Sequence, residues 1–471
     1  MSVARLVPHA AVGPGLFVAA AAAYLGLTAT AGRFPHIDEV AYKAAGFHLA
    51  ADGRWHAPEL IGLIPAAVPV EEFWAGYPPV YTLAFAAAVW AAGMGWRTAA
   101  LFDAVIHVGL AATAVWFTAR ITPAGRRAWA VGLAALAVGT VGRPDELGMT
   151  FGLIGLARLR TADSLWAVVR AGGWLGLAAA TAPGAAVVHG LIGAIAVGRA
   201  DARRVGVWGV IGAAVGLASL APYELLHPGA VGQFFVHAQS YGRGWADGFA
   251  QAWRFGKHPL LMAVGLCLAA GLTAQTAGPG RAWAAGGIAG VLIVLATSPG
   301  RVTYLWYAGP VLIAAVAGWP TRAAVGVAVT AVGIGAVPTG VQTLALLTLP
   351  AGQGWAVNAA AVREAVPAGA VVVADEHWWS LAGHARVLDA HFARPPDWDR
   401  VDYGVLTGNG SGAAGQPRLP TSAALQTELA ARFVVRSDTL NGRPLRVAGV
   451  RLTNSGYGFG AVVWARAGPP P

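Results

Sequence analysis

The chain has 471 residues, of which 56% are hydrophobic and 11% charged, and its formal net charge is +10. Soluble globular proteins carry about 25% charged residues, so this composition excludes an ordinary soluble domain. No basic run clusters with aromatic residues, which argues against nucleic-acid binding, and the lone cysteine, Cys267, excludes a disulfide within the chain.

Apolar runs recur from residue 11 to about residue 347, and many approach the roughly 18 to 20 residues of a bilayer span. We therefore expect an all-α polytopic membrane bundle, whose first run is an uncleaved helix rather than a signal peptide. Two short runs meet at "TAPG" (181–184) and form either half-helices or one kinked span. The eleven expected spans are 11–31, 102–120, 127–142, 146–160, 170–181, 184–198, 205–222, 258–275, 281–297, 303–319 and 322–346.

The segment "YPPVYTLAFAAAVWAAG" (77–93) fits either a further span or a helix lying along the membrane surface. If it lies flat, the arginine-bearing loops at 120–127, 158–170 and 199–204 share one side, which the positive-inside rule makes the cytoplasm. If it spans, most of these loops move outside. We therefore expect a flat helix, an outer loop over residues 32–101 and a cytoplasmic N-terminus in the cell membrane.

The composition changes near residue 350. "VREAVPAGAVVVADEHWW" predicts a helix end, a turn and a buried strand, and "RFVVRSD" and "GFGAVVWARA" predict two more strands. We expect two domains: a membrane domain over residues 1–348 and a small extracytoplasmic α/β domain over residues 349–471.

Two acidic residues, Asp38 and Glu39, directly follow the first apolar run in "RFPHIDEVAYKAAGFHLAADGRW". Helical spacing places Tyr42 one turn after Asp38 and Lys43 one turn after Glu39, so Glu39 and Lys43 equally fit a plain ion pair. Nothing nearby obviously neutralises Asp38. A carboxylate beside an apolar helix suits a general base, although a solvated loop acid is an equally good interpretation.

A second acidic turn, "VGTVGRPDELGMTFGL", contains Arg143, Asp145 and Glu146 between two apolar runs. The expected topology places it on the same outer side as Asp38. Asp145 after Pro144 also fits a helix cap. Because the chain has few acids, two acidic outer turns suggest one shared site.

Cations on the expected outer side run against the topology rule and need a reason. One reason is an anionic ligand such as a lipid phosphate, and the other is contact with lipid headgroups. For Arg301, in a tight turn with Tyr304, we favour phosphate; Lys257 and His258 are further candidates.

The twelve histidines are scattered, and the sequence predicts no metal cluster. It also lacks a G-x-x-x-x-G-K-[ST] loop, so a nucleotide-driven pump is not expected. Whether a divalent metal ion assists as a cofactor stays open.

Four segments in this order resemble the GT-C superfamily of membrane glycosyltransferases, closest to its protein O-mannosyltransferase and aminoarabinose-transferase families. "HIDEVAYKAAGFHLAADG" resembles the Asp-Glu motif after the first helix, and "YPPVYTLAFAAAVWAAG" resembles the Pro-Pro-aromatic juxtamembrane helix. "GRPDELGMTFGLIGLARL" resembles the second acidic turn, and "SPGRVTYLWYAGP" the later Arg-Tyr turn. The resemblance covers roughly residues 10–320.

The resemblance implies an enzyme that takes a sugar from a polyprenyl phosphate and transfers it outside the cytoplasm. It implies Asp38 as the catalytic acid of the first motif with Glu39 as its companion, Asp145 as the acid of the second turn, and Arg301 as a phosphate ligand. At Tyr77 the chain departs from many relatives, which carry a basic residue or histidine before the Pro-Pro pair.

We expect Asp38 to act as general base in one displacement that inverts the anomeric centre, with the outer cations stabilising the leaving phosphate. The sugar stays open, as does the acceptor, whether protein, lipid or glycan; membrane lipids are the other expected partners, and nucleic acid is not one. The expected substrate-binding residues are Tyr42, Lys43, Tyr77, Arg143, Glu146, Lys257, His258, Arg301 and Tyr304.

Two other function classes compete with this interpretation. A transporter or flippase of a lipid-linked or small polar substrate also uses acids and arginines in a helical bundle, and a non-catalytic scaffold is the third possibility. Transporters usually show inverted repeats and mid-membrane charges. Here the charges lie at helix ends on one side, which favours the enzyme.

Overall fold

The structure is a computed structural model of the 471-residue chain. It describes residues 12–31, 39–61, 63, 68–122, 143–198, 201–240, 279–297, 307–317, 355–375, 377–390, 399–407, 431–438, 446–447, 450–451 and 461–467. Five of the expected site residues therefore lie outside the described residues: Asp38, Lys257, His258, Arg301 and Tyr304.

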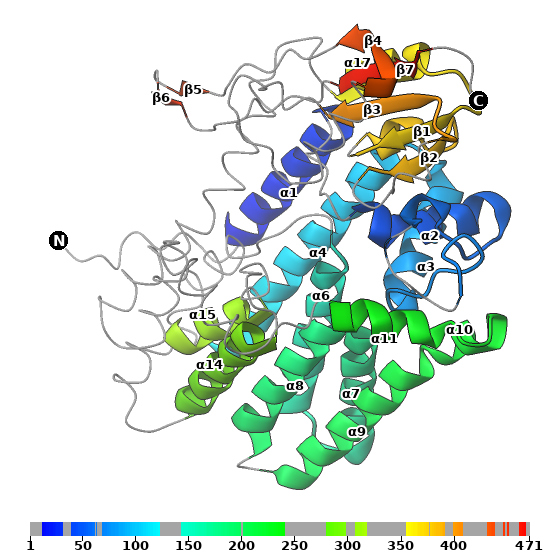
Figure 1. Ribbon diagram of the computed structural model, residues 1–471. Helices are drawn as coiled ribbons and strands as arrows, with labels where there is room; N and C mark the ends of the chain where they lie inside the picture. The colour runs from blue at the N-terminus through cyan, green and yellow to red at the C-terminus, as the bar shows by residue number, and fades with distance from the viewer. Residues whose placement is uncertain are drawn as a thin grey trace.

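Most of the described chain is a bundle of apolar helices (Figure 1). Its helices are α1 (Val12–Ala31), α4 (Trp96–Ile121), α6 (Pro144–Arg160), α7 (Leu165–Ala179), α8 (Pro183–Gly198), α9 (Ala202–Ala218), α14 (Pro279–Thr297) and α15 (Gly309–Ala317). Six of these helices begin within five residues of the start of an expected span. The α4 helix begins six residues before its expected span, and α15 begins six residues after the start of its own. The expected spans 127–142, 258–275 and 322–346 lie outside the described residues, so the count of eleven stays a prediction.

Small residues allow the bundle helices to approach closely. α7 packs against both α6 and α9. A Cβ added at Gly172 of α7 would come within 2.7 Å of Ile211 Cβ on α9, so this crossing requires glycine. Nearby, the buried Trp208 indole donates a hydrogen bond to the Ala171 carbonyl oxygen at 3.1 Å. The break expected at "TAPG" is a real helix end, since α7 stops at Ala179 and α8 begins at Pro183.

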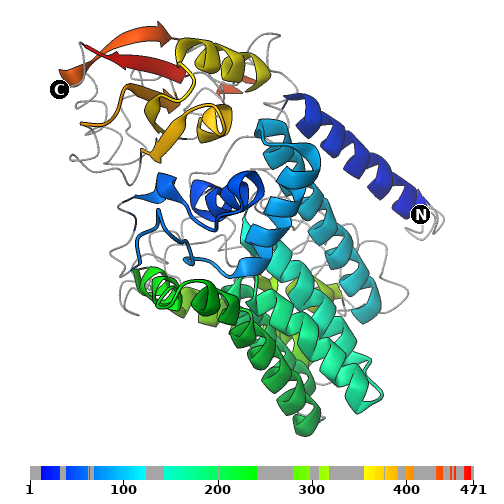
Figure 2. The same cartoon turned by 90° about the vertical axis from the view of Figure 1, so that its right-hand side faces the viewer.

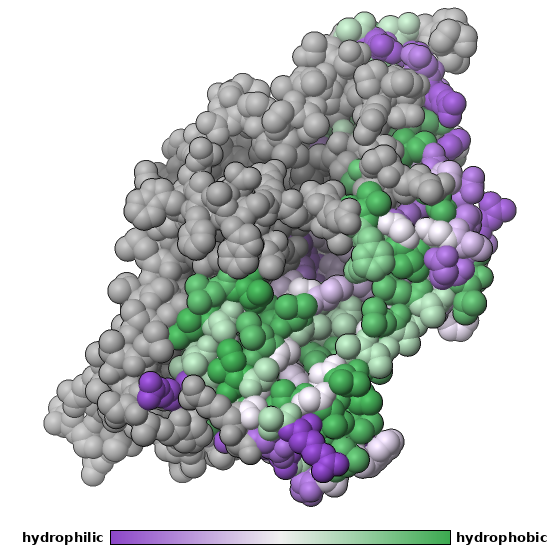
Figure 3. Space-filling model, turned by 60° about the horizontal axis from the view of Figure 1, so that its bottom comes forward, coloured by the Kyte–Doolittle hydropathy of each residue, from purple (hydrophilic) through white to green (hydrophobic). Residues whose placement is uncertain are grey.

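Several described bundle helices expose large apolar side chains. On the face that Figure 3 shows, hydrophobic side chains cover the middle of the described surface, and hydrophilic ones gather at its lower edge and at its upper right. On α9, Val210 and Leu217 are each 68% exposed. Within the described residues, two helical stretches, Trp96–Ile121 and Ala202–Leu226, are long and apolar enough to cross a membrane. Contact with lipid would account for such exposed apolar side chains.

A second layer of helices lies between the bundle and the sheet (Figures 1 and 2). Its main members, α2 and α3, pack against each other. The α3 helix begins with Pro79 at its first turn, and the Val80 N–H donates to the Ala180 carbonyl of the α7–α8 turn at 3.1 Å. The elements of the layer are α2 (Glu39–Asp52), η2 (Pro58–Leu60), α3 (Pro79–Ala92), α10 (Ala221–Leu226) and α11 (Val231–Ser240).

The C-terminal part is an α/β unit, as expected. Its five-stranded sheet has the order β2-β1-β3-β7-β4, with β1 parallel to β2 and β3 and with β7 antiparallel to β3 and β4. The three segments expected as strands form β1, β4 and β7. The elements are α17 (Trp355–Ala365), β1 (Val371–Ala374), α18 (Trp378–Leu381), β2 (Arg386–Asp389), β3 (Tyr403–Thr407), β4 (Phe433–Asp438), β5 (Arg446–Val447), β6 (Val450–Arg451) and β7 (Ala461–Arg466).

The sheet unit and the second layer share one hydrophobic core. Trp378 and Trp379 of α18 are buried with Phe47 of α2 and Phe85 of α3. The rings of Phe47 and Trp378 meet edge to face, with centroids 6.1 Å apart. The C-terminal unit therefore packs against α2, the helix that contains Glu39 of the first acidic motif. The expected boundary between residues 348 and 349 lies outside the described residues.

Candidate active site

The first acidic motif leads into a fully buried ion cluster. Lys43 of α2 is 0% exposed, and its Nζ donates to Glu39 Oε2 at 3.1 Å and to the Asp103 carboxylate of α4. The Trp379 indole donates to Glu39 Oε2 at 2.8 Å, and the Tyr81 hydroxyl donates to Asp103 Oδ1 at 3.0 Å. One cation and two carboxylates are thus enclosed with hydrogen-bond donors, which is how a buried charge is tolerated.

This geometry bears on Glu39 and Lys43, for which the sequence allowed two interpretations. The plain i,i+4 ion pair is present, and its lysine is sealed from solvent. Because Lys43 is buried, we interpret the cluster of Lys43, Glu39 and Asp103 as a structural contact that joins α2, α4 and α18, and not as a site where Lys43 touches substrate. Asp103 was missed because it falls inside an expected span. The sequence does contain a sign of its importance, since a carboxylate within an apolar run, such as Asp103, needs a specific partner.

The second acidic turn opens α6. Arg143 is the N-cap residue and makes no side-chain capping bond, and Pro144 follows at the first helical position. Asp145 lies inside the first turn, so it is not the cap that the sequence also allowed. Its Oδ2 accepts a hydrogen bond from Arg143 Nε at 2.9 Å, and its Oδ1 accepts one from the Tyr307 hydroxyl. Acids in a first turn also suit the helix dipole.

Tyr307 connects this turn to the last of the four sequence motifs. It stands in "SPGRVTYLWYAGP", three residues after Tyr304, just before α15. Its contact with Asp145 joins segments 162 residues apart. Sequence reasoning chose Arg301 and Tyr304 from this motif and passed over Tyr307, although a tyrosine at a helix entrance is a plausible hydrogen-bond donor.

Glu146 points its carboxylate at a different helix. Its Oε1 lies 2.7 Å from Nδ1 of His107 on α4, and Glu146 is 1% exposed. The His107 ring in turn lies beside Tyr24 of α1, with centroids 5.7 Å apart. Glu146 therefore ties α6 to α4 near the site, and His107 is a second residue that sequence reasoning missed.

The two acidic motifs meet through Tyr42 and Arg143. The Arg143 guanidinium lies over the Tyr42 ring, 5.5 Å from its centroid, which is cation–π distance. Tyr42 also packs edge-on against Tyr77, with ring centroids 4.7 Å apart, and Tyr77 packs in the same way against His237 of α11 at 4.7 Å. Tyr42, Tyr77, Arg143 and Asp145 thus form one polar and aromatic group at the end of the bundle. His237 was not singled out in the sequence.

The group of Tyr42, Tyr77, Arg143 and Asp145 combines a carboxylate, a guanidinium and aromatic rings. Asp145 is 16% exposed at its side chain, and Arg143 is 5% exposed. A partly open carboxylate accepts hydrogen bonds or a proton from a hydroxyl, and a guanidinium binds phosphate or holds a carboxylate in place. Aromatic rings around them supply apolar surface for a ligand. The group suits a ligand that carries hydroxyls and a phosphate.

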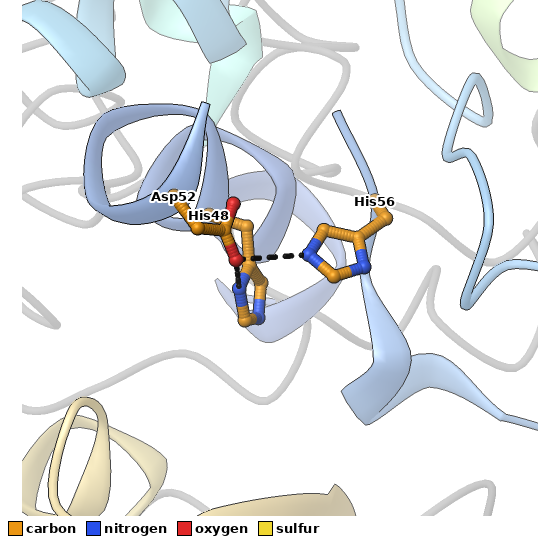
Figure 4. Close-up of side chains that lie close together, drawn as sticks. All are labelled: His48, Asp52 and His56. Atoms are coloured by element: carbon orange, nitrogen blue, oxygen red, sulfur yellow. Dashed lines mark hydrogen bonds and ion pairs between the residues drawn. The ribbon is translucent and has the colours of Figure 1, made fainter. Parts of the chain in front are cut away.

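A separate cluster, His48, Asp52 and His56, lies at the far end of α2 and just beyond it (Figure 4). Burial lowers the pKa of His48, but the Glu59 carboxylate, with Asp52, outweighs burial and raises it above the ordinary value. Burial raises the pKa of Asp52, but hydrogen bonds from the Arg54 backbone N–H and from His56 outweigh it and lower that pKa. The fold therefore brings together His48 and His56, two of the histidines that are scattered in the sequence.

Comparisons with known proteins bear on the fold. No protein-family model matches the chain, and no curated protein matches its sequence. The structure is similar to that of ArnT from Cupriavidus metallidurans, solved with undecaprenyl phosphate bound; the TM-score is 0.58 at 15% identity, over 98% of this chain and 100% of that one. It is also similar to the oligosaccharyltransferase of Archaeoglobus fulgidus, solved with zinc and sulfate, at TM-score 0.51 and 14% identity, over 85% of this chain and 69% of that one.

Both of these proteins are GT-C glycosyltransferases. The resemblance inferred from the four sequence segments is therefore confirmed at the level of the fold. The chain has the fold of the GT-C membrane glycosyltransferases.

Proposed function

We propose that the protein is an integral membrane glycosyltransferase that moves a sugar from a polyprenyl-phosphate donor to an acceptor on the extracytoplasmic side. The fold supports this, since one structural neighbour was solved with undecaprenyl phosphate. The proposal includes the eleven-span topology, the membrane domain over residues 1–348 and the outer domain over residues 349–471.

One observation carries the proposal. Arg143 of the second acidic turn lies over Tyr42, which stands four residues after Asp38. Motifs about 100 residues apart in the sequence therefore contribute to one group of side chains. The contact of Tyr307 with Asp145 adds a third motif. A transferase needs this convergence, because an acceptor hydroxyl and a donor phosphate must be held together.

In the proposed mechanism Asp38 takes the proton of the acceptor hydroxyl. The acceptor oxygen forms a bond to the anomeric carbon as the bond from that carbon to the phosphate oxygen breaks, so the configuration inverts. The polyprenyl phosphate leaves with the bonding electron pair. Arg301, with Lys257 or His258, stabilises its charge. Asp145 binds sugar hydroxyls and is held in place by Arg143.

Substitution of Asp38 by asparagine is the primary test. The Asp38→Asn variant should insert into membranes normally. Membranes that contain it should transfer no labelled sugar from the undecaprenyl-phosphate-linked hexoses or pentoses that the wild type accepts. A single general base typically contributes 10²–10⁴-fold. Asp163→Asn is the matched control, because Asp163 lies in the exposed α6–α7 turn. Full transfer by Asp38→Asn would reject Asp38 as the base.

The same donors distinguish the transporter class. A flippase would carry the labelled lipid across proteoliposomes with its sugar–phosphate bond intact. The proposed transferase breaks that bond and releases polyprenyl phosphate. Lipid movement without bond cleavage in the wild type would therefore replace the transferase proposal with the transporter.

A further inference from the structure

We propose that His48, Asp52 and His56 form a binding site for one divalent transition-metal ion, with Zn²⁺ the ion that best matches the ligands. The site is separate from the group around Tyr42 and Arg143, and it does not depend on the proposed transferase activity. Two imidazoles and one carboxylate are a common ligand set for such ions, and three protein ligands leave a fourth position for water.

Local structure brings the three side chains together. His48 and Asp52 are one helical turn apart on α2, so they share a face. Gly53 follows with φ 73°, a left-handed conformation that turns the chain back toward the helix. The Asp52 Oδ1 accepts a hydrogen bond from the Arg54 backbone N–H at 3.0 Å, which fixes the turn. Figure 4 shows the His56 ring reaching Asp52 from this returning segment.

Two of the ligand-atom spacings are those expected around a tetrahedral metal ion, and both are longer than a charge-assisted hydrogen bond. Asp52 Oδ2 lies 3.4 Å from His48 Nδ1 and 3.3 Å from His56 Nε2, and the three ligand atoms all lie within 4.8 Å of one another. A tetrahedral ion with bonds of about 2.1 Å places its ligand atoms about 3.4 Å apart. Charge-assisted hydrogen bonds are shorter, at about 2.7–2.9 Å.

The other nitrogen of each histidine is already held. His56 Nδ1 donates to the Glu71 carbonyl oxygen at 2.9 Å, so Nε2, which faces Asp52, is the nitrogen that would bind an ion in place of its proton. His48 Nε2 lies 3.0 Å from Glu59 Oε1, so Nδ1, which faces Asp52, is the nitrogen that would bind an ion in place of a proton. Metal-binding histidines are almost always oriented in this way by a carboxylate or a carbonyl.

Glu59 connects the site to the C-terminal unit. It is 4% exposed, and the same Oε1 accepts a hydrogen bond from the Trp378 indole at 3.1 Å. The Asp52 side chain is 43% exposed, so an ion can reach the ligands from solvent. A bound ion would therefore hold the segment after α2 against that helix and keep Glu59 in position under α18.

Zinc binding is measured on the purified full-length protein in detergent, without a histidine tag and after removal of metals with EDTA. Titration of Zn²⁺ against a competing fluorescent chelator should show one ion per chain. Mg²⁺ and Ca²⁺ should not displace it, because these ions prefer oxygen ligands. The variants Asp52→Asn and His56→Gln should each bind at least tenfold more weakly.

Two further variants separate direct ligands from other residues. Glu59→Gln should weaken binding about 10- to 100-fold, as loss of an outer partner does. His227→Gln is the matched control and should bind like the wild type, because His227 is partly exposed and pairs with one acid, Glu72, at 3.6 Å, outside the three-ligand cluster. Asp38→Asn should also bind like the wild type, even if it abolishes transfer.

The proposal is overturned if the wild type binds no stoichiometric Zn²⁺. It is also overturned if Asp52→Asn and His56→Gln both retain wild-type affinity. Asp52→Asn alters a partly exposed side chain and should fold, so a folding defect in His56→Gln does not prevent the decision.

Discussion

The two ends of α2 carry ionic clusters of opposite character. At the first end, Lys43 is fully enclosed, and its carboxylate partners Glu39 and Asp103 are 2% and 1% exposed. At the other end, His48 and His56 are partly exposed and Asp52 is 43% exposed. The first cluster already contains a cation, Lys43, and is closed to solvent. The second has two carboxylates nearby and is open to solvent. The difference in burial thus distinguishes the structural Lys43 cluster from the His48 cluster, which can take up an ion.

The largest expected effect is at Lys43. Lys43→Met removes the cation that Glu39 and Asp103 share among the described residues, and loss of one partner of a buried ion pair should cost about 3–5 kcal/mol of stability. Asp103→Asn should cost less, because Lys43 and Glu39 remain as a neutral pair. Thermal unfolding in detergent measures both. A Lys43→Met protein with the melting temperature of the wild type would contradict the structural role of the Lys43 cluster.

A smaller effect is expected where the second acidic turn meets Tyr307. Tyr307→Phe removes the hydroxyl that donates to Asp145, and a hydrogen bond to a charged group is worth about 1.5–3 kcal/mol. Transfer should fall at least roughly tenfold in kcat/KM while the fold is kept. Tyr403→Phe on β3 is the control and should transfer normally. Equal activity in both variants would show that Tyr307 does not position Asp145.

The smallest effect is expected at the open end of α2. In the absence of metal, Asp52→Asn should change the free energy of unfolding by no more than about 1 kcal/mol, because exposed ion pairs contribute little. Added Zn²⁺ should raise the melting temperature of the wild type and not that of Asp52→Asn. A large loss of stability in metal-free Asp52→Asn would mean that this end is as structural as the Lys43 end.

Sequence patterns predicted the bundle well where polar residues bounded each apolar run. The helices α6 to α9 begin and end near arginines, prolines and glycines that interrupt the hydrophobic pattern. The valine-rich strands β1, β4 and β7 were predicted for the same reason. Their sheet order was not, because β3 pairs with β7 across a sequence gap that local patterns do not encode.

The site was predicted in outline and not in its contacts. The acidic motifs and their order pointed to Tyr42, Arg143 and Asp145, which the structure brings into one group. Asp103 and His107 were missed because both lie within an apolar helix and acquire partners only when helices pack. The histidine cluster was missed because His56 joins it through the turn at Gly53.

The central claim is that the two acidic motifs share one outer site, and cross-linking tests it most directly. With Cys267 replaced by serine, the chain offers a cysteine-free background for the pair Asp38→Cys and Asp145→Cys. A short bifunctional maleimide should cross-link this pair within the chain. It should not cross-link Asp38→Cys with Asp163→Cys, because Asp163 follows the 17-residue helix α6, about 25 Å from Asp145 at the helical rise. No cross-link between positions 38 and 145, or a cross-link between 38 and 163 instead, would contradict the account.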